Sequence, residues 1–179
     1  MDETLLIAQL QDRQTLDRAF RTLMTQYKER LYWHIRKIVI NHDDADDVLQ
    51  NTFIKVYRNI HSFKGESKLY SWMYRIATNE SLSFIKKRAK QLQIGSEELQ
   101  LQLVANLEAD VYYDGDEMQK KLLYAVAKLP KKQALVFNMK YFDNMKYTEI
   151  AEILEVSVGG LKASYHHAVK KIERIITSD

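Results

Sequence analysis

Apolar side chains recur every three or four residues in the first half of the chain, which is the spacing of an amphipathic helix with one buried face. The first stripe consists of Leu16, Phe20, Leu23, Tyr27, Leu31, Ile35 and Ile38. The pattern breaks at residues 41–44, where Asp43 or Asp44 is a good N-cap for a second helix. That helix carries Leu49, Phe53, Val56 and Ile60 on its core face. After a polar loop at residues 61–67, a third helix is predicted from about Lys68 to Lys90.

The second half of the chain predicts a helix-turn-helix. One helix begins at Leu129-Pro130, because proline suits the first turn of a helix. Residues 147–154 form a short helix, and Ser157 is a natural N-cap for a longer one. Small Ala151 lets these two helices approach closely, and Val156 fills the turn between them. The inward stripe of the last helix is Leu161, Tyr165, Ala168 and Ile172, and its outward face is Lys162, Ala163, His166, His167 and Lys170. Such a helix can enter the major groove of DNA, so we favour DNA binding over a plain helical pair.

Composition supports an all-α fold for these 179 residues. The chain has five glycines and one proline, too few for the frequent turns that a β-rich fold needs. An apolar fraction of 46% and a charged fraction of 28% are typical of a soluble globular protein. The absence of cysteine excludes disulfides and thiolate metal sites. The acidic N-terminus and the short apolar runs predict neither a secretion signal nor a membrane span, so we expect a cytoplasmic protein.

Charge divides the chain into three parts. Residues 1–90 hold 16 Lys and Arg against 11 Asp and Glu, and residues 120–179 hold 11 against 6. Residues 91–119 hold no Lys or Arg and seven acids, a net charge of −7. This pattern predicts two small basic domains, joined by a flexible acidic linker with a short helix around residues 97–107. The alternative is an acidic helix packed on either domain. Because the linker has no evident core, we expect the two domains to be mobile relative to each other.

Two segments of the first domain suggest chemistry. The acids at residues 43–47 could bind magnesium and a diphosphate, as in some transferases, but no second acidic cluster exists outside the linker. Helix capping is the better explanation, and we expect neither a metal site nor a cofactor. The third helix combines Trp72 and Tyr74 with a basic end at residues 86–90, and this combination suits the capture of unpaired bases. A core role for the aromatic residues fits the spacing equally well.

Taken in order, these motifs resemble the extracytoplasmic-function (ECF) type of bacterial sigma factor. The residues that carry the resemblance are Asp46-Asp47-Val48-Leu49-Gln50-Asn51-Thr52-Phe53, Ser62-Phe63-Lys64-Gly65-Glu66-Ser67, the segment at 70–79, Leu129-Pro130, Tyr141-Phe142 and the helix at 147–154. The resemblance covers essentially the whole chain. It assigns residues 1–90 to sigma region 2, a helical bundle, residues 91–119 to the linker, and residues 120–179 to the helix-turn-helix of region 4.

The resemblance implies a function without catalysis. The protein would bind core RNA polymerase, direct it to promoters and help to open the DNA, and an inhibitory anti-sigma factor is an expected partner. Core polymerase would contact Asp46, Asp47, Gln50 and Asn51. The −10 element would be bound by Ser62, Phe63, Lys64, Gly65, Trp72, Tyr74, Asn79, Lys86, Lys87 and Arg88, with the loop at 62–65 and Asn79 holding a flipped base. The −35 element would be read by Ser157, Gly160, Lys162, Ala163, His166, His167 and Lys170.

The last helix departs from many relatives, in which it opens with Gly-Thr and is rich in arginine. Here it opens with Gly159-Gly160, and no arginine offers bidentate recognition of guanine. Readout would then depend on Lys162, histidine contacts and DNA shape. Lys146 replaces the serine that usually caps the preceding helix, so that capping box is incomplete. An alternative function is a helix-turn-helix regulator that acts without polymerase, which would leave the Asp46–Asn51 face without a partner.

Overall fold

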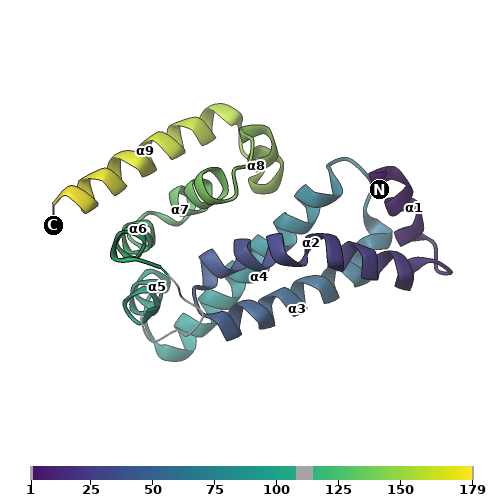
Figure 1. Cartoon of the computed structure of the whole chain (residues 1–179), viewed down its shortest axis with the longest axis horizontal. Coiled ribbons are helices and arrows are strands. Elements are labelled where there is room, and N and C mark those ends of the chain that lie inside the picture. The colour runs from purple at the N-terminus through teal and green to yellow at the C-terminus, as the bar shows by residue number, and fades with distance from the viewer. Residues whose placement is uncertain (1, 108–114, 179) are drawn as a thin grey trace.

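Helices form all the regular structure in the part of the chain that the structure describes, residues 2–107 and 115–178 of a computed structural model (Figure 1). The predicted all-α fold is confirmed. The helices gather in two lobes, with α8 of the C-terminal lobe lying against α4 of the N-terminal lobe. None of the helices in the described part combines the length and apolar character that a membrane span requires.

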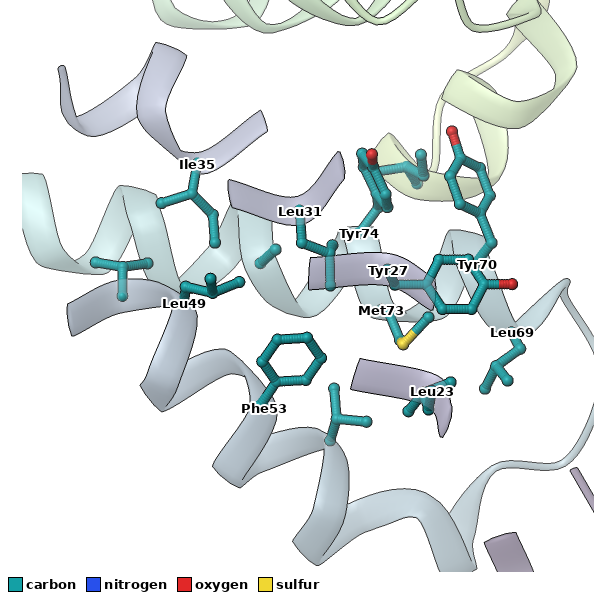
Figure 2. Packing of buried hydrophobic residues seen from close by; sticks show 14 of the residues in the cluster. Leu23, Tyr27, Leu31, Ile35, Leu49, Phe53, Leu69, Tyr70, Met73 and Tyr74 are labelled. Atoms are coloured by element: carbon teal, nitrogen blue, oxygen red, sulfur yellow. The ribbon is translucent and has the colours of Figure 1, made fainter. Parts of the chain in front are cut away.

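The N-terminal lobe is a bundle built around three long helices. Its elements are α1 (Glu3–Gln11), α2 (Leu16–Val39), α3 (His42–Asn59), the 3₁₀ turn η1 (Ile60–Ser62) and α4 (Leu69–Leu92). Helices α2, α3 and α4 pack pairwise on one another, and all seven members of the predicted stripe on α2 are buried. Figure 2 shows Leu31, Ile35, Leu49 and Phe53 meeting in this core. The buried stripe therefore holds the bundle together, as the sequence period predicts.

The start of α3 differs by two or three residues from the prediction. Asn41, rather than Asp43 or Asp44, is the N-cap, and its Oδ1 accepts a hydrogen bond of 3.0 Å from the backbone N–H of Asp44. The two aspartates lie in the first turn, where negative charge stabilises the helix dipole. Asp44 is buried and pairs with Arg88 of α4. The acid therefore joins two helices instead of capping one.

The acidic segment at 91–119 contains the predicted short helix, but this helix is packed, as in the alternative to a flexible linker. Helix α5 (Ser96–Ala105) buries Leu99 and Val104, and Val104 joins Leu107 in a cluster with Ile40 of the first lobe and Ala127 of α6 (Glu117–Ala127). The side-chain amide of Gln100 also donates to the carbonyl of Ile38 at 3.0 Å. Residues 108–114 of the predicted linker lie outside the described residues. Burial of its apolar residues thus decides the position of α5 despite the net negative charge, and the helix packs on both lobes.

The C-terminal lobe contains the predicted helix-turn-helix. After α6 come α7 (Lys131–Phe137), the π-helical turn η3 (Asn138–Phe142), α8 (Tyr147–Leu154) and α9 (Val158–Thr177). A small core joins α6, α7 and α9, and its buried members are Ala125, Val126, Leu129, Phe137, Ala168 and Ile172. The hydroxyl of Ser157 accepts from the backbone N–H of Gly160 at 3.2 Å, which caps α9 as predicted. Helix α8 has the bounds that the pattern gave.

The lobes form one arrangement in this structure, although the sequence led us to expect mobile domains. Met139, Met145 and Ile150 of the second lobe belong to the same buried cluster as Tyr70 and Tyr74 of α4. These contacts join residues that are far apart in the chain, so no local pattern could indicate them. The predicted domain boundaries at residues 90 and 120 remain a prediction.

Replacing Leu31 with Ala should lower the free energy of unfolding by about 2–5 kcal/mol, because the fully buried side chain leaves a cavity at the centre of the bundle. Chemical denaturation followed by circular dichroism measures this change. The matched control is Leu5→Ala on α1, where the side chain is 52% exposed and the change should stay within about 0.5 kcal/mol. Equal losses in both variants would contradict the packing described here.

Candidate nucleic-acid interface

The polar face of α3 is open to solvent. Asp47, Gln50 and Asn51 are exposed, and Asp46 is half-exposed with its carboxylate 3.5 Å from Nε2 of His42. The acids of residues 43–47 point in different directions, because Asp44 turns inward to Arg88. Within the described residues, no three acidic or histidine side chains gather in a group that could hold a metal ion. The geometry suits a surface that docks on another protein.

A shallow apolar groove continues this surface between α2 and α3. Its lining includes Gln50, Ile54, Tyr57 and Met24. Ile54 is 46% exposed and Tyr57 is 38% exposed, although both are large apolar side chains. The Tyr57 hydroxyl donates to Oδ1 of Asp17 at 2.8 Å, which fixes the ring at the edge of the groove. Sequence reasoning missed both residues, although their signal was present: Ile54 follows Gln50 by four positions and so shares its outward face.

The loop after α3 is held by the first helix. The Gln11 amide donates to the carbonyl of Phe63 at 2.8 Å, and the Ser62 hydroxyl donates to the carbonyl of Asn59 at 2.7 Å. Phe63 is buried with its ring 5.2 Å from that of Trp72. Gly65 has a φ of +73°, a conformation that favours glycine. The loop is therefore pinned at its start and turns sharply at Gly65.

One face of α4 forms an exposed stripe that starts at this loop. Trp72 is half-buried against Phe63, whereas Asn79 and Lys86 are exposed farther along the helix. The spacing 72, 76, 79, 83 and 86 keeps these positions on one side of the helix. Lys87 is exposed as well, but Arg88 binds the buried Asp44. The stripe thus offers an aromatic edge, an amide and a basic end.

The opposite face of α4 lies under the C-terminal lobe. Tyr70 and Tyr74 project from α4 toward that lobe (Figure 2), and Tyr74 is only 1% exposed. Burial raises the pKa of Tyr70 to about 12 and also raises the pKa of Tyr74, so both phenols stay neutral at physiological pH. Tyr74 and Phe63, both predicted to contact DNA, are core residues in this arrangement. Trp72 alone among the predicted aromatic contacts keeps an exposed part.

Helix α9 presents its predicted residues outward. Lys162, Ala163, His166, His167 and Lys170 are all exposed, while Leu161, Ala168 and Ile172 face the core. The Lys162 ammonium lies 6.0 Å from the ring centre of Tyr147 on α8. A Cβ atom built on Gly159 would meet no atom of the described residues within 4 Å. The first turn of α9 is therefore open, cationic on one side, and accessible to another molecule.

Polar contacts between the lobes were not predicted. Asp143, just after η3, places Oδ2 3.1 Å from Nδ1 of His34 and accepts a hydrogen bond from Lys37 through Oδ1. On α8, Glu152 accepts from the Ser71 hydroxyl at 2.7 Å. Glu155, the C-cap residue of α8, places Oε1 3.1 Å from NH1 of Arg75. We call the contacts that Asp143, Glu152 and Glu155 make with the first lobe the interlobe clasp. Its members lie too far apart in the chain for any periodic signal to link them.

The charge of Asp143 is stabilised by its neighbours. Burial alone would raise the pKa of this carboxyl, but the hydrogen bond and charge of His34 and the charge of Lys37 outweigh it, so the pKa lies below its ordinary value. A carboxylate with a lowered pKa stabilises the structure at pH values above its unfolded-state pKa. That stability is lost as the pH falls through the lowered pKa. The Asp143 contacts are therefore at full strength at neutral pH.

Comparisons with known proteins agree on one family. The sequence matches the family models described as Sigma-70 region 2, over residues 23–91, and Sigma-70 region 4, over residues 119–172. It is 30% identical over 164 residues to the ECF RNA polymerase sigma factor SigW of Bacillus subtilis, covering 87% of this chain and 88% of that protein. It is 29% identical to the ECF RNA polymerase sigma-E factor of Haemophilus influenzae, covering 89% and 88%.

Two solved structures share the fold. The chain superposes on CnrH in complex with the cytosolic domain of CnrY with a TM-score of 0.73 and 21% identity, over 99% of this chain and 98% of that one. The sigma factor RpoE in complex with the anti-sigma factor NepR from Bartonella quintana gives a TM-score of 0.66 and 19% identity, over 89% and 98%. At these identities the likeness establishes the arrangement of helices.

Proposed function

The chain belongs to the ECF sigma factors of the sigma-70 family, which direct RNA polymerase to promoters, and we propose that three separate surfaces divide this task. As a sigma factor the protein is a regulatory DNA-binding subunit rather than an enzyme. We place core polymerase on α3, the −10 element on the loop and stripe of α4, and the −35 element on α9. The observation that carries this assignment is that each surface is exposed on a helix whose apolar face is buried.

The site of action and a further partner belong to the proposal. Core polymerase and the chromosome are in the cytoplasm of a bacterium, so we propose that the protein acts there. We also propose that it has an anti-sigma partner, on the strength of its structural likeness to RpoE, which was solved with the anti-sigma factor NepR.

The α3 surface has the mixed character of a protein interface. Asp47, Gln50 and Asn51 supply hydrogen-bonding groups, and the neighbouring Ile54 and Tyr57 supply apolar area that water would otherwise cover. Protein interfaces typically combine an apolar centre with a polar rim. A helix-turn-helix regulator acting without polymerase would have no use for this surface, which is why the sigma function explains more of the chain.

The α4 surface suits a base removed from the stack. Unstacking a base costs a few kcal/mol, so promoter opening needs a site that offsets this cost with stacking and hydrogen bonds. The amide of Asn79 can both donate and accept toward a base edge, and Trp72 offers part of an aromatic ring. Lys86 and Lys87 lie on the same helix, where they can neutralise phosphates. The role of the buried Phe63 in this proposal is to pack against the ring of Trp72.

The α9 surface suits contact with duplex DNA. The N-terminus of a helix attracts phosphate, and here Ser157, Gly159 and Gly160 leave that end unobstructed. Lys162 and Lys170 add positive charge, and His166 and His167 lie between them on the exposed side. Base discrimination would come from these residues and from the shape of the groove.

The double variant Asp47→Ala/Gln50→Ala should weaken binding to core polymerase about tenfold, because the two truncations together remove about 1.4 kcal/mol of interface contacts. Fluorescence anisotropy with purified core polymerase measures the affinity. Glu29→Ala/Gln26→Ala on α2 is the matched control, since it removes an exposed acid and an exposed amide elsewhere. If neither the wild type nor either variant binds core polymerase while all bind duplex DNA, the protein is a regulator of another kind.

The variant Asn79→Ala should slow the formation of open complexes on duplex promoters about tenfold, with a much smaller effect on a template that is already melted. The reason is that a base-edge contact, worth about 1–3 kcal/mol, is needed most when the base must leave the stack. Permanganate footprinting of both templates measures the difference. Ser83→Ala, one turn farther along the same exposed face, is the control. Equal loss on both templates would rule out the flipped-base role.

The variant Gly159→Ala should stabilise the protein by up to about 1 kcal/mol and yet weaken binding to −35 DNA. Alanine is the better helix former, and its Cβ meets no described atom within 4 Å in the free protein. In a complex, the same methyl group would occupy the space through which a phosphate approaches. Thermal denaturation and a gel-shift assay measure the two effects. The control is Gly95→Ala, whose Cβ also meets no described atom within 4 Å, and it should leave DNA binding unchanged. If Gly159→Ala binds DNA as tightly as the wild type, the phosphate does not approach at Gly159.

A further inference from the structure

Helix α1 contacts the loop between α3 and α4 at both of its ends (Figure 1). At the start of the loop, Nε2 of Gln11 donates to the carbonyl of Phe63 at 2.8 Å and to that of Ile60 at 3.4 Å. At the end of the loop, Oε1 of Glu3 accepts from the backbone N–H of Leu69 at 3.2 Å. Glu3 and Gln11 are the first and last residues of α1, so one helix connects the two ends of the loop.

The N-terminus of α4 takes an acceptor from α1. The N-cap residue of α4 is Lys68, whose ammonium can only donate, so its side chain cannot cap the helix. Glu3, which lies 66 positions before Leu69, supplies an acceptor to the first N–H of α4. Its negative charge is also stabilised at the positive end of the helix dipole. A residue of α1 therefore helps to fix the start of the helix that carries Trp72 and Asn79.

Helix α1 is fixed in the bundle by contacts that do not involve the loop. Leu6 and Leu10 are buried in the main core, with exposed fractions of 2% and 0%. The Thr15 hydroxyl donates to the carbonyl of Gln9 at 2.7 Å, which ties the end of α1 to the start of α2. Because α1 has its own anchorage, it can serve as a fixed reference position for the loop.

The middle of the loop is open, in contrast to its ends. Phe63 and Leu69 are buried, whereas Lys64, Gly65 and Glu66 between them are exposed. A Cβ atom built on Gly65 would meet no described atom within 4 Å. The turn at Gly65 thus stands clear of the bundle, and its position is set by how the two ends of the loop are held.

We propose that α1 is the positioning element of this loop: Gln11 and Glu3 hold its two ends so that the conformation that accepts a flipped base exists before DNA arrives. This inference rests on the proposed assignment of the loop at 62–65 and Asn79 to the −10 element. Preorganisation removes the cost of ordering the loop at the moment of binding. The match to the region 2 family model begins at residue 23, so α1 lies before the matched part of the chain.

The proposal separates base recognition from the attraction of phosphates. A loop released at one end samples several conformations, and its apparent affinity for a base falls by the fraction that remains competent. Lys86 and Lys87 lie farther along α4, so their attraction for phosphates, and the salt dependence that it produces, should not change. If Gln11 and Glu3 contributed only to global stability, base preference would be unaffected at temperatures at which the variants are folded.

The first test compares Gln11→Glu with the wild type in holoenzyme reconstituted from the full chain and core polymerase. A carboxylate has nearly the shape of the amide but no N–H to donate, so it cannot bind the two loop carbonyls. The matched control is Gln14→Glu, which adds the same charge at an exposed position just after α1. The probe is a pool of short single-stranded oligonucleotides of random sequence, and sequencing of the bound fraction measures the preference for each base.

We expect the strongest base preference to fall about fivefold in Gln11→Glu and to stay within about twofold of the wild type in Gln14→Glu. The salt dependence of binding to the whole pool should be the same for all three proteins. An equal loss of preference in both variants would show an effect of the added charge and overturn the proposal.

The second test uses Glu3, at the other end of the loop. Glu3→Gln keeps a side-chain oxygen that can accept from the Leu69 N–H, so base preference should be retained. Glu3→Ala removes the acceptor and should lose base preference as Gln11→Glu does. Glu29→Ala, which removes an exposed acid of α2, is the control. Equal losses in Glu3→Gln and Glu3→Ala would contradict the hydrogen bond as the means of positioning.

The order of the loop is measured independently by hydrogen exchange and mass spectrometry of the full chain. Peptides that cover residues 60–69 should exchange about tenfold faster in Gln11→Glu and Glu3→Ala, because local opening of the loop no longer breaks these contacts. Peptides of α2 should exchange as in the wild type, which shows that the bundle remains folded. Unchanged exchange of the loop, or faster exchange without a loss of base preference, would refute the positioning role.

These outcomes are separable from a failure of the proposed function. If wild-type holoenzyme initiates transcription but enriches no base, the loop does not hold a base, and both the loop assignment and its positioning by α1 are wrong. If the wild type selects bases and Gln11→Glu selects the same bases equally well, the role of α1 alone is refuted. Both variants should bind core polymerase as the wild type does, and weaker binding would assign α1 to the polymerase interface instead.

Discussion

Helix α4 must pack against several neighbours at once, and this constraint decides which of its residues can meet DNA. Helices α2 and α3 cover it along much of its length, and α8 and α5 cover it near its two ends. Met73, Ala77 and Ile85 are buried among these neighbours. Before the last turns of the helix, the fully exposed residues Asn79, Ser83 and Lys86 lie on the stripe that begins at the half-buried Trp72. A helix that belongs to the core of the bundle therefore presents its polar face in a fixed orientation, which lowers the entropy lost on binding.

Local signals were sufficient for most of the helices. The helix at 147–154 and the cap at Ser157 follow from residues within a few positions of each other, and the structure agrees with both. The linker was predicted from the net charge of the whole segment at 91–119, and that sum does not reveal which apolar residues in it can pack. Its net charge of −7 suggested an extended segment, yet Leu99 and Val104 of α5 and Leu107, just after it, are buried. The acids of α5 remain solvated on the outside while the leucine face packs, so charge count and packing are compatible.

The candidate site was predictable where exposure follows the helical period. Asp47, Gln50 and the outward face of α9 lie where the pattern put them, and Asn79, which the resemblance indicated, is exposed as well. The aromatic residues of α4 could not be separated by composition, because Tyr70 and Tyr74 on one face and Trp72 on the other are equally apolar. Their difference comes from the C-terminal lobe, which buries only the tyrosines. Residues more than a hundred positions apart, such as Asp143 and His34, can be in contact without producing any periodic pattern in the sequence.

The distribution of acids on the helix-turn-helix has a single physical explanation. Glu149 and Glu152 lie on α8 and Glu155 is its C-cap residue. Their carboxylates contact Lys68 at the N-cap of α4, at 3.8 Å, and Ser71 and Arg75 on α4. The exposed side of α9 instead carries Lys162 and Lys170. Separation of charge within one small lobe gives it two unlike surfaces: a cationic surface attracts phosphates, and an acidic surface attracts whatever binds phosphates. Because region 2 is itself basic, the acidic surface turns toward it whenever the lobes meet. Attraction between these acids and the basic first lobe therefore adds to the apolar contacts in the orientation that leaves α9 exposed.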